Sequence, residues 1–354
     1  MEDGTVLRAD VFRPTDDGRH PVIMTHGPYA KGLEFAEGYP GMWGLLSAKY
    51  PDAVAGSTNK YQNWETADPE KWVRDGYVCV RVDSRGAGRS PGHLDIFSAQ
   101  ETRDYYECIE WAGTQAWSNG KVGLLGISYY AVNQWQVAAL RPPHLAAICP
   151  WEGASDHYRE FARHGGILNV FTSVWFPVQV SAVQHGVGER GARNPNTGEP
   201  VAGPDTWPAA ELVAHRTDSV AELRARPYYD EFYRERSAEL EKITVPVLSA
   251  ANWGMTSTPA ATSRATPASP RNTSGWKSTA LSTSPSSTPT TASRCRSGSS
   301  DTSSPARTPA GTSSRPCSST SGTSTGASSC ARSTNGRSPG PSGPRCTWTR
   351  GAGR

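Results

Sequence analysis

Residues 121–140 read KVGLLGISYYAVNQWQVAAL, and the spacing of the apolar residues changes within this stretch. Its first six residues form a short apolar run that contains glycine, which is typical of a buried parallel strand. The segment from Ala131 to Leu140 carries apolar side chains at helical spacing, which predicts a helix. Ser128 therefore falls on a strand-to-helix turn. Such a turn can hold a serine hydroxyl in a strained position, with the amide of the next residue beside it.

The motif around Ser128 departs from the usual G-x-S-x-G pattern of such turns. Tyr130 stands where the last glycine is expected, and the small residue Ala131 comes one place later. A serine at this place also fits an ordinary turn in which its side chain caps the following helix. These residues alone leave both interpretations open.

Strands and helices alternate on the amino-terminal side of this turn. Strands are predicted within DGTVLRADVFRP (3–14), HPVIMTHGPYAKG (20–32) and GYVCVRVDSRGAGRSPG (76–92). An amphipathic helix is predicted over residues 101–111. This order predicts an α/β fold with a doubly wound, mostly parallel sheet, and an active site at the carboxyl ends of its strands.

In this order, the segments resemble the Xaa-Pro dipeptidyl-peptidase and cocaine-esterase-like (CocE/NonD) group of α/β-hydrolases. The matching pieces run from the amino terminus to about Gly254 and include DGTVLRADVFRP, PVIMTHGPYAKG, VRVDSRGAGRSPG, GISYYA and WEGASDHYREFARHGGI. The resemblance implies that Ser128 is a nucleophile. It also implies hydrolysis of an ester or an amide, such as an Xaa-Pro peptide bond, through an acyl-serine intermediate without a cofactor or a metal.

The resemblance further implies an oxyanion hole built from Tyr29 and Tyr129. Tyr29, in GPYAKG, matches the family tyrosine whose hydroxyl joins the backbone amide of the residue after the nucleophile, which here is Tyr129. A phenol can donate a hydrogen bond to a developing alkoxide, so the assignment is chemically sound. The alternative is a loop tyrosine that packs its ring beside Tyr129.

The segment DSRGAGRS, residues 83–90, places two glycines after a strand. It lacks the third glycine of a dinucleotide-binding loop, so a nucleotide site is not predicted. We interpret it as a structural loop beside the strand-to-helix turn, closed by Asp83 and Arg85.

The alternation of strands and helices stops after residue 150. We expect residues 1–150 to form the amino-terminal part of an α/β-hydrolase core, and residues 151–242 to form a helical cap inserted over the active site. The sheet is expected to resume with a last core strand over residues 243–254, beginning near Pro246.

No histidine follows this last predicted strand. All eight histidines precede residue 216, whereas the resemblance implies a catalytic base well after residue 254. His157 and His164 lie seven positions apart and are predicted to share one helix face. Without a third ligand, a core or solvated face is a better interpretation of this pair than a metal site.

The composition changes abruptly at Met255. Residues 255–354 include 45 Ser and Thr residues and no Val, Ile, Phe, Tyr, His, Glu or Gln. Such a segment cannot bury a core, and we expect it to be disordered or unpacked. Its 12 Lys and Arg residues against Asp301 alone give a charge of +11, which leaves −8 for residues 1–254.

This tail has three interpretations: a disordered linker, a basic arm for nucleic acid, or a shifted reading frame of a GC-rich gene. Its arginines are scattered with few aromatic residues between them, which disfavours the nucleic-acid arm. One permitted set of codons for residues 272–284 gives YKWLEVHGLEHF when its first two bases are dropped, and this peptide resembles the family's histidine segment. We therefore favour the frameshift, with the base encoded across Ser282 and Thr283 and the acid across Met255 and Thr256.

The frameshift hypothesis predicts that the chain as written lacks both the acid and the base and is inactive. The alternative is a catalytically dead scaffold, or another non-enzymatic product, with a basic disordered tail. In either case, the lineage is expected to act on a small-molecule ester or amide or on a short peptide. We expect no nucleic-acid or membrane partner, and the sequence does not fix the oligomeric state.

Cysteine usage bears on the compartment. Cys79, Cys108 and Cys149 lie in apolar or amphipathic runs, without the spacing of a zinc site or a disulfide framework. We also expect no signal peptide, and the sequence contains no apolar run long enough to span a membrane. These features predict a reduced, cytoplasmic protein.

Overall fold

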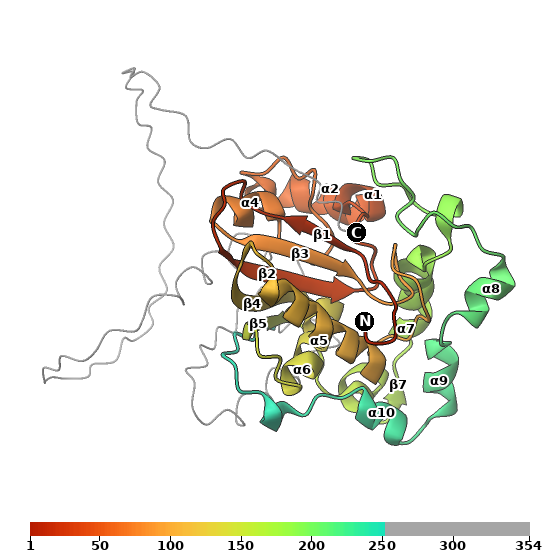
Figure 1. The fold of residues 1–354 in the computed structure, drawn as a ribbon. Coiled ribbons are helices and arrows are strands. Elements are labelled where there is room, and N and C mark those ends of the chain that lie inside the picture. The colour runs from red at the N-terminus through yellow and green to blue at the C-terminus, as the bar shows by residue number, and fades with distance from the viewer. Residues whose placement is uncertain (252–354) are drawn as a thin grey trace, which may run out of the picture.

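A five-stranded sheet forms the centre of the molecule (Figure 1). The computed structural model describes residues 1–251. The strands are β1 (Ala9–Phe12), β2 (His20–Gly27), β3 (Val78–Asp83), β4 (Ser118–Ile127) and β5 (Leu145–Trp151). Their order across the sheet is β1-β3-β2-β4-β5, in which β1 is antiparallel to β3 and all other pairs are parallel. The predicted mostly parallel sheet is confirmed.

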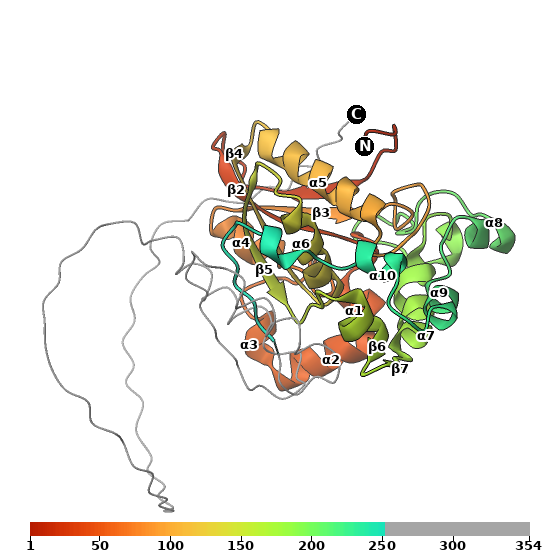
Figure 2. The same cartoon turned by 90° about the horizontal axis from the view of Figure 1, so that it is seen from below.

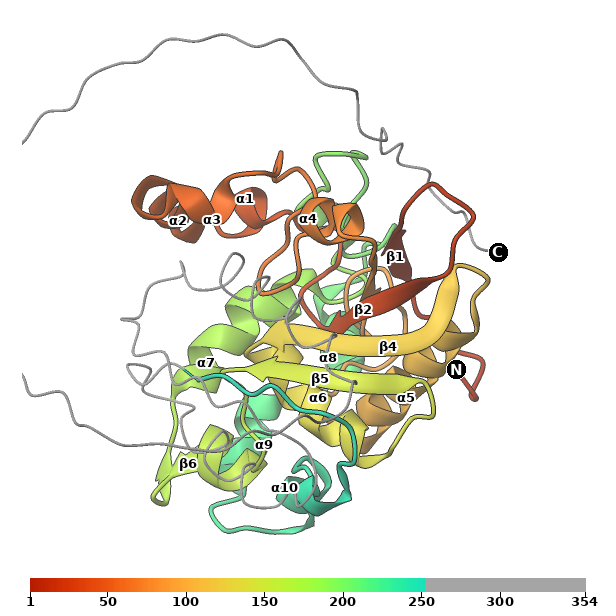
Figure 3. The same ribbon diagram turned by 90° about the vertical axis from the view of Figure 1, so that its left-hand side faces the viewer.

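Helices cover both faces of this sheet. The helices between the strands are α1 (Phe35–Gly38), α2 (Pro40–Lys49), α3 (Pro51–Val54), α4 (Pro69–Arg74), α5 (Ala99–Thr114) and α6 (Tyr129–Ala139). Figure 3 shows α1 to α4 together on one side of the sheet, away from α5 and α6, which lie in front of the sheet in Figure 2.

The alternation of side chains along β2 explains this two-sided packing. Met24 packs in the cluster that contains Trp135 of α6. The preceding residue, Ile23, packs in the cluster that contains Trp72 of α4. Successive residues of a strand point to opposite faces, so a strand buried on both sides must be apolar throughout. The continuous apolar runs of the sequence meet this condition.

Short helices and a small hairpin replace the strands between β5 and residue 242. They are the α-helices α7 (Phe171–Trp175), α8 (Ala209–Ala214), α9 (Ser219–Ala225) and α10 (Glu231–Glu235), the π-helices η1 (His157–Ala162) and η2 (Phe176–Val180), the 3₁₀ turns η3 (Ser181–Val183), η4 (Gly188–Arg190) and η5 (Leu240–Lys242), and the hairpin of β6 (Arg163–His164) and β7 (Ile167–Leu168). In Figure 1, α7 to α10 gather at one end of the sheet. The division of the chain at residues 150 and 242 stays a prediction.

The predicted helix that carries both His157 and His164 is wrong. The helical segment ends at Ala162, and the next two residues form β6, which pairs with β7. Gly165 and Gly166, at φ 60° and 87°, turn the chain between the two short strands. His164 therefore lies on a strand and shares no helix face with His157.

The strand predicted over residues 243–254 is not regular within the described part of the chain. Only isolated parallel bridges join this segment to β5, at Ile148 with Val247 and at Trp151 with Ala250. Pro246 has no N–H group to donate, but its carbonyl accepts from the amide of Ile148 at 3.0 Å. Residues 252–254, the tail and the codons assigned to the acid and the base lie outside the described residues.

The described residues also include the three cysteines considered above. Cys79, Cys108 and Cys149 are all buried, and Cys79 and Cys108 carry free thiols. Within residues 1–251, no helix combines the length and the apolar character needed to cross a membrane.

Candidate active site

Ser128 is the single residue between the end of β4 and the start of α6. Its backbone adopts φ 57° and ψ −117°, a conformation that residues other than glycine rarely adopt. Its amide donates to the carbonyl of Trp151, and its carbonyl accepts from the amides of Ala131 and Val132, each at 2.9 Å. The predicted strand-to-helix turn is confirmed. The Ser128 side chain makes no capping hydrogen bond, so the alternative interpretation as a helix cap does not hold.

Glycines on neighbouring elements make room for the unusual motif. A Cβ atom on Gly27 would lie 2.7 Å from the ring of Tyr130, and one on Gly126 would lie 2.2 Å from the Tyr130 Cβ. A Cβ on Gly153 would likewise lie 2.7 Å from the Cβ of Ala131. These distances are too short for real carbon contacts. The bulk of Tyr130 and Ala131 is therefore accommodated by glycines near the ends of β2 and β4 and by a glycine two residues beyond β5.

Buried polar side chains hold α6 against the sheet. Asn133 donates to the carbonyl of His26 at 2.6 Å. Gln134 accepts from the amide of Cys149 at 2.9 Å and donates to the carbonyl of Tyr130 at 2.5 Å. Because these bonds reach both β2 and β5, they fix the first turns of the helix that follows Ser128.

Ser128 is half-buried and lines a cavity of about 90 Å³. Most of the wall is apolar or aromatic, and it is formed by Tyr29, Phe97, Tyr129, Val132, Ala154, Phe161, Phe171 and Trp175. Glu152, Glu160 and Asn169 complete the lining. The cavity therefore offers an apolar space for a small group next to a serine hydroxyl.

Tyr29 is buried and lines the same cavity as Ser128. The indole Nε1 of Trp175 donates to the Tyr29 hydroxyl at 3.0 Å, so this hydroxyl acts as the acceptor in that bond. Burial raises the pKa of Tyr29 well above its ordinary value, which keeps the phenol protonated near neutral pH. The ring also packs edge-on against Tyr129, with 5.7 Å between centroids. Tyr29 thus shows the ring packing of the alternative interpretation and also lines the cavity.

The side chain of Tyr129 is anchored by Glu101, which the sequence analysis did not identify. The Tyr129 hydroxyl lies 2.8 Å and 2.7 Å from the two carboxyl oxygens of Glu101, and the Phe97 amide donates to this carboxyl at 2.7 Å. Burial raises the pKa of Glu101 to about 7, although these hydrogen bonds oppose the shift. Ser98 caps α5, and its side chain accepts from the amide of Glu101. The S-x-x-E pattern of Ser98–Glu101 is therefore the sequence signal that could have drawn attention to this glutamate.

Two further acidic residues flank the Ser128 turn. The carbonyl of Glu65 accepts from the amide of Ile127 at 3.3 Å, and Glu152 directly follows Trp151, which bonds to Ser128. Both residues have positive φ, 59° and 55°. Burial raises the pKa of both carboxyl groups, and the charge of Glu152 adds to the effect at Glu65. No sequence pattern marks a non-glycine residue with positive φ, so both were missed.

None of the eight histidines, all of which lie in the described residues 1–251, lines the cavity. His20 pairs with Asp16 at 2.8 Å, and His144 pairs with Glu110 at 2.7 Å. His26 is completely buried, and this burial lowers its pKa to about 4. The part of the chain that the structure describes therefore brings no imidazole base to Ser128.

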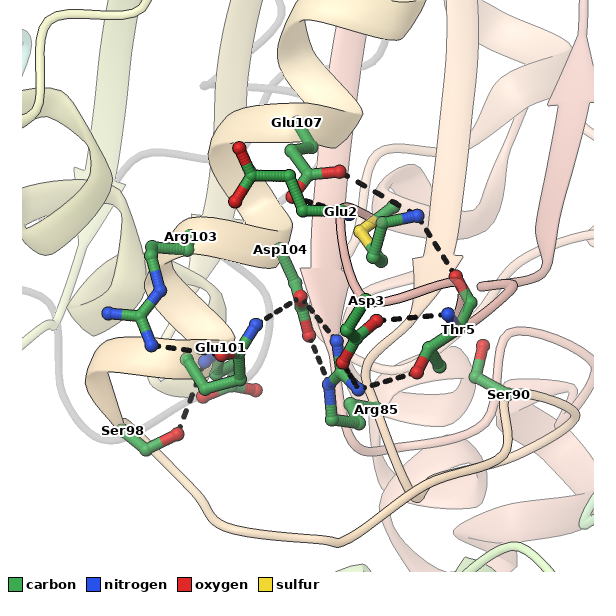
Figure 4. Close-up of polar contacts among 12 residues, drawn as sticks. Glu2, Asp3, Thr5, Arg85, Ser90, Ser98, Glu101, Arg103, Asp104 and Glu107 are labelled. Carbon is green, nitrogen blue, oxygen red and sulfur yellow. Dashed lines mark hydrogen bonds and ion pairs between the residues drawn. The ribbon is translucent and has the colours of Figure 1, made fainter.

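The DSRGAGRS loop is held by Asp83 and Arg85 in two separate ways. Asp83 accepts from the amides of Lys31 and Arg89 at 2.5 Å and 2.8 Å. Arg85 instead makes a two-pronged bond to Asp104 of α5, at 2.7 Å and 2.8 Å, and also reaches Asp3 (Figure 4). The loop is structural, as predicted, but Arg85 ties it to α5 and the amino terminus.

Comparisons with known proteins identify the family. The model of the X-Pro dipeptidyl-peptidase (S15) family matches residues 3–271. Cocaine esterase of Rhodococcus sp. (strain MB1 Bresler) is 34% identical over 171 residues, which cover 48% of this chain and 25% of the esterase. The crystal structure of a CocE/NonD family hydrolase from Staphylococcus aureus is 33% identical with a TM-score of 0.59, over 78% of this chain and 44% of that chain.

This chain therefore spans about a quarter of the cocaine esterase and less than half of the Staphylococcus aureus hydrolase. The match covers the sheet, the Ser128 turn and the short helices beside them. The sheet order and the resemblance to solved CocE/NonD hydrolases establish an α/β-hydrolase fold. The chain belongs to the X-Pro dipeptidyl-peptidase family of α/β-hydrolases.

Proposed function

We propose that this protein descends from a serine hydrolase in which Ser128 attacks the carbonyl carbon of an ester or an amide, such as an Xaa-Pro peptide bond. The observation that carries the proposal is the backbone of Ser128, at φ 57° and ψ −117°, on a turn that lines the cavity. The attack forms an acyl-serine as the alcohol or amine departs with a proton. Water then releases the acid and restores the serine.

The oxyanion that forms during this attack needs hydrogen-bond donors. We assign this role to the Tyr29 hydroxyl and the backbone amide of Tyr129. Trp175 donates to the Tyr29 oxygen, which leaves the Tyr29 proton free to point elsewhere. The bonds between Glu101 and the Tyr129 hydroxyl support the second donor, because they restrain the residue whose amide is used. Neutral, fixed donors of this kind stabilise a transition state without rearrangement.

The proposed substrates are small esters, amides or short peptides, with no cofactor, nucleic-acid or membrane partner. A cavity of about 90 Å³ with aromatic walls supports a small apolar acyl group or side chain. Peptidase and esterase activity both belong to the family, and both reactions pass through the same acyl-serine.

The chain as written is proposed to be inactive, since it supplies no imidazole to Ser128. All of its histidines lie within the described residues, and none of them lines the cavity. A serine without its base keeps only the catalysis of the oxyanion hole and binding, roughly 10³ to 10⁴ over the uncatalysed rate. The same observation favours the second candidate, a catalytically dead scaffold.

The test compares three proteins on a p-nitrophenyl ester and on an Xaa-Pro p-nitroanilide. The chain as written is expected to give no measurable turnover. A protein whose reading frame is shifted after Gly254, to encode the alternative peptide, is expected to gain turnover. In that shifted protein, Ser128→Ala should abolish the activity again.

Each outcome separates the two candidates. Ordinary turnover by the chain as written, lost on Ser128→Ala, would show that one of the histidines between His20 and His215 acts as the base and that the inactivity proposal is wrong. An inactive shifted protein would instead favour the scaffold. The nucleotide sequence around codon 255 provides an independent check, because the frameshift requires an open alternative frame there.

A further inference from the structure

Aromatic rings form a connected wall around the Ser128 cavity. Six of the residues that line it contact one another in series, in the order Phe171, Trp175, Tyr29, Tyr129, Phe97 and Phe161. Successive ring centroids are 5.7 Å, 6.3 Å, 5.7 Å, 4.1 Å and 5.4 Å apart. The face of an aromatic ring carries partial negative charge, so such a wall attracts a cation as well as an apolar group.

Two glutamates add negative charge to the same lining. Glu152 and Glu160 both line the cavity, and the described residues that form its wall include no Lys, Arg or His. Glu160 is fixed by the amides of Ser155 and Asp156, which donate to its Oε2 at 2.7 Å and 3.0 Å. The lining therefore combines aromatic faces with carboxyl groups and contains no cation of its own.

The carboxyl group of Glu152 lacks the support that Glu160 has. Burial raises the pKa of Glu152, and no hydrogen bond or positive charge within residues 1–251 offsets this effect. A carboxylate that is half-buried among aromatic rings without a partner is costly to ionise. A cation bound in the cavity would offset that cost, because it would supply the missing partner.

We propose that the cavity binds a quaternary ammonium group of the substrate, with Glu152 as its counter-charge and the aromatic rings around its methyl groups. The proposal rests on the proposed function, because it names a class of ester or amide for the cavity that contains Ser128. The methyl groups of a quaternary ammonium present an apolar surface to the walls, and aromatic cages are a recurrent way to recognise such ions.

The polar groups of the lining suit a primary ammonium less well. A primary ammonium carries three N–H groups that need acceptors once it leaves water. Asn169 already accepts from the amide of Phe171 at 2.9 Å, and Glu160 accepts from the two amides given above. A quaternary ammonium has no N–H group, so a single carboxylate and the ring faces meet all its requirements.

The size of the cavity limits the bound group. Its volume is about 90 Å³, far below the ~300–1,000 Å³ of a pocket that encloses a drug-sized ligand. It therefore suits one compact head group close to the serine hydroxyl rather than a long chain.

The test is isothermal titration calorimetry of the full chain with three small probes. Choline carries the quaternary ammonium, 3,3-dimethylbutan-1-ol has the same shape with carbon in place of the charged nitrogen, and ethanolamine carries a primary ammonium. Choline should bind at least about tenfold more tightly than either of the other probes, since only choline has both the charge and the methyl surface.

Two variants separate the charge from the rings. Glu152→Gln keeps the shape of the side chain and should weaken choline binding at least about tenfold, while binding of the neutral alcohol stays the same. Phe171→Leu removes a ring that stacks on Trp175 and should weaken choline binding by about two- to fivefold. Glu241→Gln is the matched control, because this exposed carboxyl lies outside the cavity, and it should change neither affinity.

The unchanged affinity of Glu152→Gln for the neutral alcohol also serves as the check that its cavity is intact. Equal binding of choline and 3,3-dimethylbutan-1-ol, or no measurable binding of choline, would overturn the proposal. So would a preference for choline that survives Glu152→Gln, or ethanolamine that binds as tightly as choline. Because binding is measured without turnover, an inactive chain can still support the proposal, and loss of the choline preference would leave the assignment of Ser128 untouched.

Discussion

Replacing Glu101 with Gln is expected to stabilise the protein at alkaline pH and to have little effect at acid pH. Only 6% of the Glu101 surface is exposed, and burial raises its pKa from the ordinary value of 4.5 to about 7. A group whose pKa is higher in the folded chain holds its proton more tightly there. The stability associated with Glu101 is therefore fully present below pH 4.5 and is lost as pH rises through about 7.

The magnitude follows from the size of the shift. Each pKa unit corresponds to roughly 1.4 kcal/mol, so ionising Glu101 costs the folded chain about 3 kcal/mol above the folded pKa. Gln resembles the protonated carboxyl. Its carbonyl can accept from the Phe97 amide while its NH₂ donates to the Tyr129 oxygen, in place of the bonds that Glu101 makes. Glu101→Gln should thus keep the contacts and remove the cost of ionisation.

The measurement is urea unfolding of the full chain and of Glu101→Gln at about pH 5 and about pH 8, on either side of most of the titration. The free energy of unfolding of the variant should exceed that of the original chain by up to about 3 kcal/mol at the higher pH, and by little at the lower pH. Glu241→Gln serves as a control on an exposed carboxyl and should change neither value. If Glu101→Gln is destabilising at the higher pH, Glu101 is needed as an anion and the reasoning fails.

Two further predictions concern the loop and the turn. Arg85→Ala should destabilise the chain by about 3–5 kcal/mol, because it removes the guanidinium that neutralises the fully buried carboxylate of Asp104, to which Gln100 also donates. Asp3→Ala removes the exposed partner of Arg85 and should leave the denaturation midpoint almost unchanged. Equal effects of the two variants in chemical denaturation would contradict this account. Gly126→Ala should lower the free energy of unfolding by about 1–3 kcal/mol, because the added Cβ would lie 2.2 Å from the Cβ of Tyr130. If the thermal unfolding midpoint equals that of the original chain, the turn can move to make room and this account is wrong.

Local patterns of the sequence determined the elements of the core. The alternation and the continuous apolar runs predicted β2, β3 and β4, and the helical spacing predicted α5 and α6, because these periodicities are properties of adjacent residues. The place of Ser128 followed from them, since a turn must lie where a strand pattern changes to a helix pattern. The double glycine at 165–166 was a local turn signal too, and weighing it would have corrected the helix predicted through His164.

The tertiary structure alone decided how the residues around Ser128 are supported. Trp175 donates to Tyr29 across 146 positions of sequence, and Glu101 meets the Tyr129 hydroxyl across 28. Gly27 makes room for Tyr130 from a different strand, so the missing glycine of the motif is replaced by one far away in the chain. A sequence pattern reports the neighbours of a residue along the chain, whereas burial, pKa and close contact depend on neighbours in space. For this reason, the sequence determined where the proposed nucleophile stands, and only the packing of distant segments decided its surroundings.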